Sequence, residues 1–244
     1  MSAQLTLATA RRILAQLRAD PRTIALIVVV PSALITLLYF VYNGSPAFDR
    51  IAVSMLGILP MLVMFLITSI AMLRERTSGT LERLLTTPLH RADLLLGYGI
   101  AFSVMAGIQS LALWAITRWA LGVETAGPMW WLLAVAAASA GVGVATGLLA
   151  SAFSRTEFQA VQLMPIFIGP QIFLCGLLAA RDSMPDLLQW VSNALPMTYA
   201  VEALGAIATT SQPGSEASTD IAILCGFALA ALACAAASMP RQTR

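Results

Sequence analysis

The 244-residue sequence is 59% hydrophobic and 11% charged, and its mean hydropathy is +0.82. A soluble domain is about 45–50% apolar and about 25% charged, so these few charges could not solvate the surface of a soluble chain. The apolar residues also come in runs of about twenty, the length that crosses a bilayer as a helix. The composition therefore excludes a soluble globular protein and indicates an all-α polytopic membrane protein.

Residues 1–23 predict a cytoplasmic amphipathic helix. Between residues 4 and 20, apolar residues recur among Arg11, Arg12 and Arg18, a pattern typical of a basic helix that lies on the inner leaflet. Arg11 and Arg12 superficially match a twin-arginine export signal, but the further apolar runs argue against that interpretation.

Six apolar runs follow, each 18 to 25 residues long. A helix needs about 20 residues to cross a hydrocarbon core of about 30 Å. Each run therefore predicts one span of a transmembrane domain over residues 24–239, with residues 240–244 as a cytoplasmic tail. The runs are Ile24–Val41, Ile51–Leu73, Leu94–Thr117, Met129–Phe153, Phe158–Ala180 and Ile221–Met239.

The distribution of arginine predicts the orientation of the chain. With a cytoplasmic N-terminus, eleven arginines lie inside and three, Arg50, Arg118 and Arg181, lie outside, the bias that the positive-inside rule describes. All five tryptophans then fall at or near the outer interface, as an aromatic belt would. We therefore expect a multi-pass protein of a bacterial inner membrane with both termini in the cytoplasm.

Residues 74–93 interrupt the apolar chain between the second and third runs. Seven of these twenty residues are charged, and Leu81, Leu84 and Leu85 recur at helical spacing. Pro88 should end such a helix. The pattern predicts a short amphipathic helix on the cytoplasmic face. Spacing alone leaves three roles open: a solvated loop with orientation charges, a helix on lipid, or a helix in a partner's groove.

The same segment resembles the signature of the ABC-2 family, the permeases of ATP-binding-cassette exporters. The family pattern runs Arg-Glu-x-x-x-Gly-Thr-Leu-Glu-x-Leu-Leu-x-Thr-Pro and, a few residues later, Leu-Leu-Gly-Lys. Tyr98 stands where many members have the lysine, and Leu195–Ile207 is similar to the family's Leu-Pro-x-Thr-Tyr segment. The residues that match the first motif are Arg74, Glu75, Gly79, Thr80, Leu81, Glu82, Leu84, Leu85, Thr87, Pro88, Leu95, Leu96 and Gly97.

This resemblance implies that residues 74–93 form a coupling helix, which fits a groove on a cytoplasmic ATPase subunit. The leucines would be buried in the groove and the charged side chains would set orientation at its rim, while Gly79 would allow a close approach or a sharp turn. The resemblance also implies a second permease protomer, identical or a sister subunit, and short outer re-entrant helices in residues 181–218. The implied coupling residues are Glu75, Gly79, Thr80, Leu81, Glu82, Leu84, Leu85 and Pro88.

No catalytic, cofactor or metal site is predicted from the sequence. A Walker A loop requires a lysine and the sequence contains none, so we expect ATP with Mg to bind the partner subunit. The glycine-rich stretch Gly141–Gly147 lies within a run and predicts close helix packing rather than a phosphate loop. The single histidine, His90, lies outside the predicted spans, which argues against a membrane enzyme. An ion-gradient-driven secondary transporter is the alternative.

Polar side chains inside the runs are candidates for a translocation path, notably Gln109, Gln162 and Gln171. A buried glutamine can equally hold helices together through a hydrogen bond worth about 1 kcal/mol, and both interpretations stay open. The uncharged walls favour an amphipathic or lipophilic cargo. We expect drug or antibiotic efflux first and lipid or glycan export second, with membrane lipid but no nucleic acid as a partner.

Overall fold

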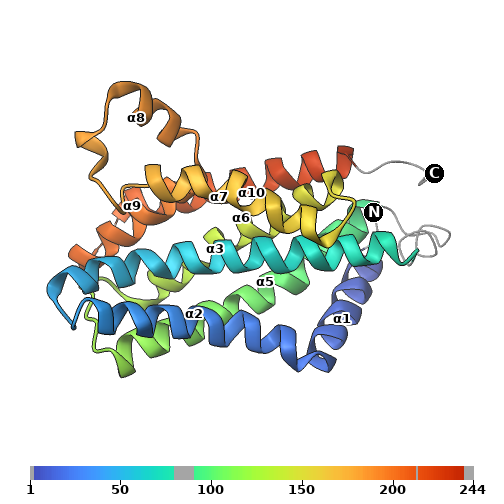
Figure 1. Cartoon of the computed structure of the whole chain (residues 1–244), viewed down its shortest axis with the longest axis horizontal. Coiled ribbons are helices and arrows are strands. Elements are labelled where there is room, and N and C mark those ends of the chain that lie inside the picture. Colours follow the sequence, from blue (N-terminus) through green and yellow to red (C-terminus); the bar gives the residue numbers. More distant parts are fainter. Residues whose placement is uncertain (1–2, 80–90, 213, 239–244) are drawn as a thin grey trace.

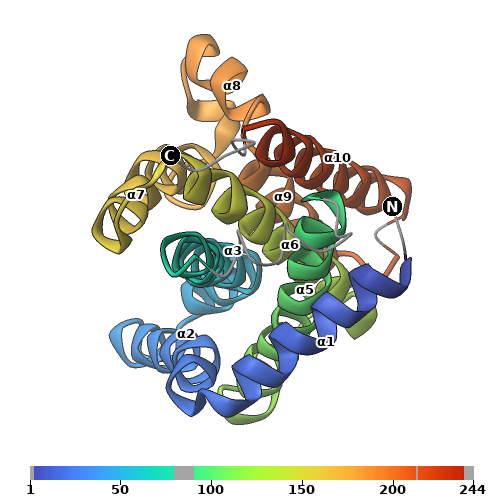
Figure 2. The same cartoon turned by 90° about the vertical axis from the view of Figure 1, so that its right-hand side faces the viewer.

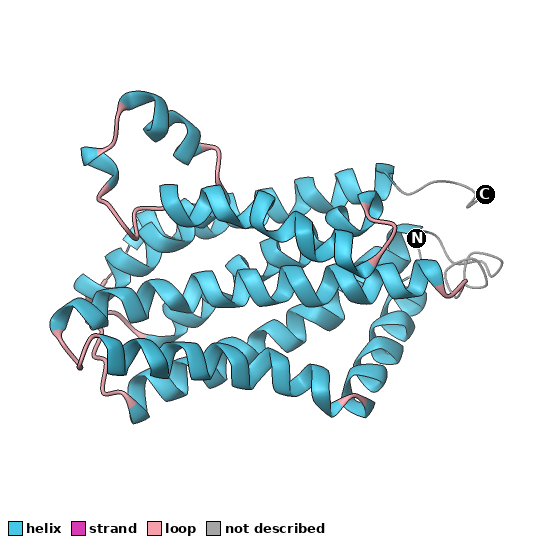
Figure 3. Ribbon diagram, in the orientation of Figure 1, coloured by secondary structure: helices cyan, strands magenta, loops and turns pink. Residues whose placement is uncertain are grey.

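The computed structural model describes residues 3–79, 91–212 and 214–238, and every regular element in these ranges is helical (Figures 1 and 3). The described part of the chain thus confirms the predicted all-α fold. A π-helical turn, η1, extends α5, and a 3₁₀ turn, η2, precedes α8. The elements are α1 (Ala3–Ala19), α2 (Pro21–Val41), α3 (Pro46–Thr77), α5 (Arg91–Ala115), η1 (Ile116–Ala120), α6 (Met129–Phe153), α7 (Glu157–Leu174), η2 (Arg181–Ser183), α8 (Asp186–Asn193), α9 (Pro196–Thr209) and α10 (Gly214–Ser238).

The long helices form a bundle with two distinct ends (Figure 1). α1 crosses one end and α8 projects from the other; we call them the α1 end and the α8 end. α2, α5 and α7 run toward the α8 end, and α3, α6 and α10 run back. The described arginines that lie at the α1 end include Arg11, Arg12, Arg18, Arg22, Arg74, Arg76 and Arg155. The structure therefore keeps apart the two sets of arginines that the sequence assigns to opposite sides.

Five of the described helices are long and apolar enough to cross a membrane, namely α2, α3, α5 with η1, α6 and α10. The fifth predicted run, Phe158–Ala180, extends beyond its helix, because α7 ends at Leu174. The Cys175 N–H closes the last turn on the Gln171 carbonyl at 2.9 Å, and Gly176 then takes a left-handed φ of 89°. At 18 residues, α7 is not among the five helices.

The last helix begins earlier than the sequence predicts. The sixth predicted run begins at Ile221 and the outer segment was expected to reach residue 218, but α10 begins at Gly214. Glu216 lies in its first turn, where a carboxylate favours the positive end of the helix dipole. The hydroxyl of Thr219 donates to the Ser215 carbonyl at 2.8 Å. Polar residues at a helix start therefore account for this error in the boundary.

α3 is the central helix of the bundle. In the end-on view of Figure 2 it lies between α2, α6 and α7, and 78% of its most apolar 18-residue stretch is buried, against 17% for α2 and for α10. Its 32 residues span about 48 Å at about 1.5 Å per residue, more than the hydrocarbon core of about 30 Å. α3 is therefore long enough to carry its terminal charges beyond the bilayer.

α3 and α6 run in the same direction and touch through their backbones. A Cβ added to Gly143 would overlap the Met61 carbonyl oxygen, and one added to Gly147 would lie 2.5 Å from the Phe65 carbonyl oxygen. One turn earlier, the Ser139 hydroxyl donates to the Gly57 carbonyl at 2.8 Å. Small residues every fourth position therefore form this contact, which we call the α3–α6 seam. It confirms that the glycine-rich stretch serves close helix packing.

Candidate functional site

α3 ends at the α1 end where the predicted coupling segment begins. The Ser78 N–H donates to the Arg74 carbonyl at 2.9 Å, and Gly79 follows with a left-handed φ of 71°. Among the described residues, no atom lies within 4 Å of a Cβ built on Gly79, and the left-handed φ is one that glycine adopts without strain, as a sharp turn requires. The other predicted coupling residues lie outside the described residues: Thr80, Leu81, Glu82, Leu84, Leu85 and Pro88.

Glu75, the remaining predicted coupling residue, is bound within the chain. Its carboxylate pairs with the Arg12 guanidinium of α1 at 3.1 Å, and its side chain is only 11% exposed. The buried Tyr98 of α5 interacts electrostatically with both partners. Because this contact joins α1 to the end of α3, a displacement of α3 would either move α1 or break the ion pair.

Two further arginines tie the end of α3 to α6 and α7. Arg74 forms a two-pronged ion pair with Glu157 at the start of α7, with N–O distances of 2.7 and 3.1 Å. Arg76 donates to the Ser151 carbonyl near the end of α6. Arg74 and Glu157 are 63% and 50% exposed, so water screens their attraction. α3 is thus connected at this end to three other helices.

α1 packs directly on α5 at Gly97, one of the motif residues. A Cβ at this position would lie 2.7 Å from the Thr9 side chain and 3.1 Å from the Thr6 carbonyl oxygen. The Thr6 hydroxyl also donates to the buried Asp93 carboxylate at 3.3 Å. Gly97 therefore lets the two helices touch, which gives a physical reason for glycine after the two leucines.

The three glutamines considered for a translocation path lie in different environments. Gln109 of α5 is 1% exposed, and neither of its amide atoms has a hydrogen-bond partner among the described residues. Gln162 is exposed on α7. Gln171 donates to the Phe167 carbonyl at 2.7 Å and accepts from the Met197 N–H at 3.2 Å. Gln171 thus joins α7 to the start of α9.

The α8 end is closed by neutral hydrogen bonds together with one arginine. The buried Ser192 hydroxyl donates to the Leu174 carbonyl at 2.8 Å, and the Thr198 hydroxyl donates to the Ser192 carbonyl at 2.9 Å. Arg181 of η2 contacts both Glu202 and Asn193. These contacts fold the segment after α7 back against α9, beside an outer cavity of about 950 Å³ lined in part by Arg181 and Glu202.

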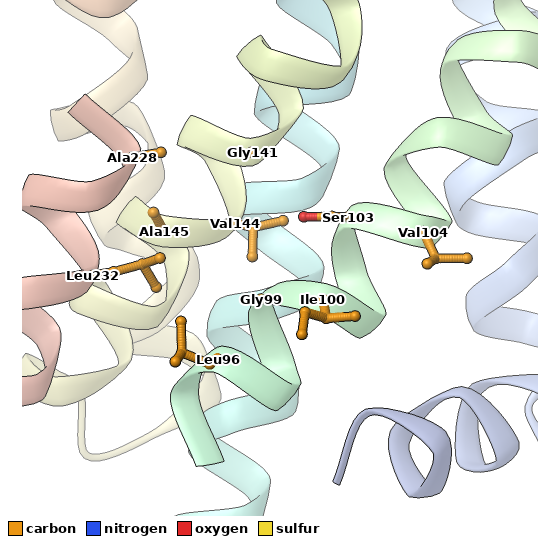
Figure 4. Close-up of a pocket in the computed structure, with 10 residues that line it drawn as sticks. All are labelled: Leu96, Gly99, Ile100, Ser103, Val104, Gly141, Val144, Ala145, Ala228 and Leu232. Carbon is orange, nitrogen blue, oxygen red and sulfur yellow. The ribbon is translucent and has the colours of Figure 1, made fainter. Parts of the chain in front are cut away.

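An apolar groove of about 470 Å³ runs between α5, α6 and α10 (Figure 4). Gly99, Gly141 and Ala145 leave the space, and the side chains of Leu96 and Leu232 border it. Ser103 supplies the one side-chain hydroxyl among the ten lining residues. The groove suits hydrocarbon and offers nothing for ionic or catalytic chemistry.

The sequence model described as "ABC-2 type transporter" matches residues 3–208. The chain belongs to this family. The match includes the charged block and the contacts of the α1 end, and it confirms the resemblance carried by the motif. This ABC-2 permease is therefore a membrane-embedded, multi-pass protein with apolar helices, and its family domain is a membrane part without the ATPase cassette.

Several named proteins are similar to this ABC-2 permease. The probable multidrug ABC transporter permease YbhS of Escherichia coli K12 is 31% identical over 141 residues, covering 57% of this chain and 37% of that protein. The linearmycin resistance permease protein LnrN of Bacillus subtilis is 30% identical over 158 residues, covering 65% and 40%. ABC transporter G family member 20 of Dictyostelium discoideum is 28% identical over 138 residues, covering 57% and 19%. In each case the match spans less than half of the relative.

The sequence alone did not predict the partners of the arginines in the permease. Arg12 and Arg74 were assigned to orientation, whereas the structure pairs them with Glu75 and Glu157. The contact of Arg12 with Glu75, 63 positions away along the chain (75 − 12), could not be found from local spacing.

Proposed function

We propose that this ABC-2 permease is the membrane-spanning subunit of an exporter powered by a separate cytoplasmic ATPase subunit, which binds ATP with Mg. It works as a pair of permease protomers, identical or of two kinds. The observation that carries the proposal is the network at the α1 end: α3 leads directly into residues 80–90, and its last turns are bonded to α1, α6 and α7. A push on that segment would reach three other helices.

The cargo is an amphipathic or lipophilic molecule, with a drug or antibiotic as the first candidate and a lipid or glycan as the second. Two bacterial relatives support this order, since one is named a probable multidrug permease and the other a linearmycin resistance permease. The apolar groove beside Gly99 and Gly141 is consistent with a lipophilic environment. Gln109 is the best supported of the three path candidates, because its buried amide has no partner among the described residues and would gain from a polar cargo atom.

The topology has six spans, with both termini on the cytoplasmic side of a bacterial inner membrane. α6 ends at the α1 end, whereas α10 starts at the α8 end, so the chain must cross between them, and α7 makes that crossing. Its 18 residues extend about 27 Å, close to the hydrocarbon thickness of about 30 Å. α1 then lies on the inner leaflet, and α8 and α9 are the short outer helices.

The proposal is tested by purifying the tagged permease from its native membrane in mild detergent and assaying for a bound ATP-hydrolysing subunit. A Glu82→Arg, Leu85→Asp variant alters the coupling segment, and Glu124→Arg, at an 83% exposed side chain of the α8 end, is the control. We expect the ATPase to accompany wild type and the control, and to be lost from the coupling variant. Absence of an ATPase from wild type would contradict the proposal and favour ion-driven transport.

A further inference from the structure

A second cavity, of about 420 Å³, lies at the α1 end between α1, α2, α3 and α5. Unlike the groove of Figure 4, it combines apolar and charged walls. We call it the inner cavity. The apolar walls include Ala71 and Phe102. The polar walls include Asp20, Arg74, Glu75 and Tyr98.

The charges around the inner cavity do not cancel. Glu75 is paired with Arg12 at 3.1 Å, and Arg74 is paired with Glu157 at 2.7 Å. Asp20 belongs to none of the ion pairs found among the described residues. Of the residues that line the cavity, Asp20 and Glu75 are acidic and Arg74 is basic, which leaves one net negative charge on the lining (1 − 2 = −1).

Asp20 is held ionised by its position at the start of α2. Its carboxylate accepts hydrogen bonds from the Thr23 hydroxyl at 2.7 Å and from the backbone N–H groups of Thr23 and Arg22 at 3.3 and 3.2 Å. These bonds, with that from the Thr23 hydroxyl as the largest cause, lower the pKa of Asp20 below its ordinary value. Arg22 and Arg18 are exposed, so water and salt weaken their effect on the carboxylate.

The ion pair beside the cavity is incompletely satisfied. Glu75 Oε2 and Arg12 Nη2 are both buried, and neither has a hydrogen-bond partner among the described residues. A buried carboxylate oxygen without a partner is unfavourable. Glu75 lines the cavity and Arg12 does not, so a cation in the cavity would lie beside the carboxylate rather than the guanidinium group. The aromatic rings of Tyr98 and Phe102, stacked with centroids 6.1 Å apart, also line the cavity.

We propose that the inner cavity binds lipophilic organic cations, with their apolar groups between α2, α3 and α5 and their charge near Asp20 and Glu75. The assignment of such cations as cargo loaded from the inner leaflet rests on the proposed export function. Binding itself does not, because it can be measured on the permease without an ATPase. The inference thus names a class of cargo and the place where it first binds.

Two ions of similar shape and opposite charge test the site: tetraphenylphosphonium and tetraphenylborate. The full-length permease in lipid nanodiscs is dialysed to equilibrium against each ion, and empty nanodiscs of the same lipid correct for partition into the bilayer. We expect saturable binding of the phosphonium and none of the borate. Equal saturable binding of both ions, or of neither, would overturn the proposal.

Two variants separate charge from space. Asp20→Asn removes the charge but keeps a residue that caps a helix well, and we expect it to weaken phosphonium binding about tenfold. Ala71→Trp fills the cavity and should abolish saturable binding. Leu37 of α2 is 58% exposed, so Leu37→Trp adds the same side chain outside the cavity and should bind the phosphonium like wild type. Wild-type affinity in Asp20→Asn and in Ala71→Trp would overturn the site.

The outcome is independent of the ATPase assay. A co-purifying ATPase without saturable phosphonium binding would overturn the inner cavity as a binding site and leave the exporter intact. Saturable, charge-selective binding without a co-purifying ATPase would support the site and contradict the proposed function.

Discussion

The α3–α6 seam and the α1 end hold the same helix, α3, by opposite means. At the seam, backbone meets backbone at Gly143 and Gly147, with a neutral hydrogen bond at Ser139. At the α1 end, long charged side chains join α3 to its neighbours, as in Arg12–Glu75 and Arg74–Glu157. A close backbone contact leaves no room for sliding, whereas a hydrated ion pair such as Arg74–Glu157 can break and re-form at a cost of about 1 kcal/mol or less.

The difference teaches where the molecule can change shape. α3 and α6 should move as one rigid unit, and rearrangement should be concentrated where α1 and α7 meet the end of α3. A force applied to residues 80–90 would thus move α3 and α6 together. The contacts of α3 with α1 and α7 would then rearrange. The following predictions test the two halves of this comparison, beginning with the largest expected effect.

The seam should be the most sensitive place in the bundle. Gly143→Leu drives a side chain into the Met61 backbone. We expect the free energy of unfolding to fall by about 3 kcal/mol or more, because the backbone cannot move aside as a side chain can. Gly141→Leu is the matched control, since no atom of the described residues lies within 4 Å of a Cβ built there. The measurement is the melting midpoint of each variant in detergent by size-exclusion retention. Equal midpoints for the two variants would contradict the seam.

The contact between α1 and α5 should respond less strongly. Gly97→Val places its Cβ 2.7 Å from the Thr9 side chain. Because that side chain can shift, we expect the free energy of unfolding to fall by only about 2 kcal/mol. At Gly99, two positions along, no atom in the described part of the chain lies within 4 Å of an added Cβ, so Gly99→Val should leave stability unchanged. The same melting assay checks both variants. A stable Gly97→Val would show that α1 does not depend on this close approach.

The glutamine between α7 and α9 should have a moderate effect on stability. Gln171→Leu leaves the Met197 N–H without its acceptor, at a cost of about 1–3 kcal/mol for a buried donor. Gln162→Leu, at an exposed position of the same helix, is the control and should be neutral or slightly stabilising. If Gln171→Leu melts like wild type but changes cargo choice, the residue serves the path rather than the junction of the helices.

The exposed ion pair should have the smallest effect. Arg74→Gln and Glu157→Gln break a pair that is 63% and 50% exposed, so we expect each to cost less than about 1 kcal/mol. The double variant should lower the free energy of unfolding little more than either single variant. Added salt should reduce the difference in this free energy between each variant and wild type. Chemical unfolding at two salt concentrations measures both effects. A salt-independent loss of several kcal/mol would show that the pair is a structural anchor.

The sequence predicted the elements of the fold better than their contacts. The runs over α2, α3, α5 and α6 were correct because about twenty apolar residues have one stable form in a bilayer. The end of the run at Ala180 was wrong, since apolarity continues past Leu174 while the turn at Gly176 ends the helix. Periodicity carries no sign of such a turn.

The candidate site was predictable only in part. The motif located the junction at Gly79, because a left-handed turn leaves a local trace in the sequence. The pairing of Arg12 with Glu75 and the orientation of Gln171 toward Met197 depend on how distant helices pack. Single-residue patterns do not encode those distances, so the inner cavity could be recognised only in three dimensions.

The central claim, that α3 and α6 move together while α1 shifts, is tested most directly by spin-label distances in the permease bound to its ATPase. Labels replace Thr77 and Phe153 at the ends of α3 and α6, or Leu7 of α1 and Phe153, in a chain whose cysteines at 175, 225 and 234 are changed to serine. We predict that trapping ATP changes the distance between the labels at 7 and 153 and leaves the distance between those at 77 and 153 unchanged. A constant first distance, or a changed second one, would contradict the account.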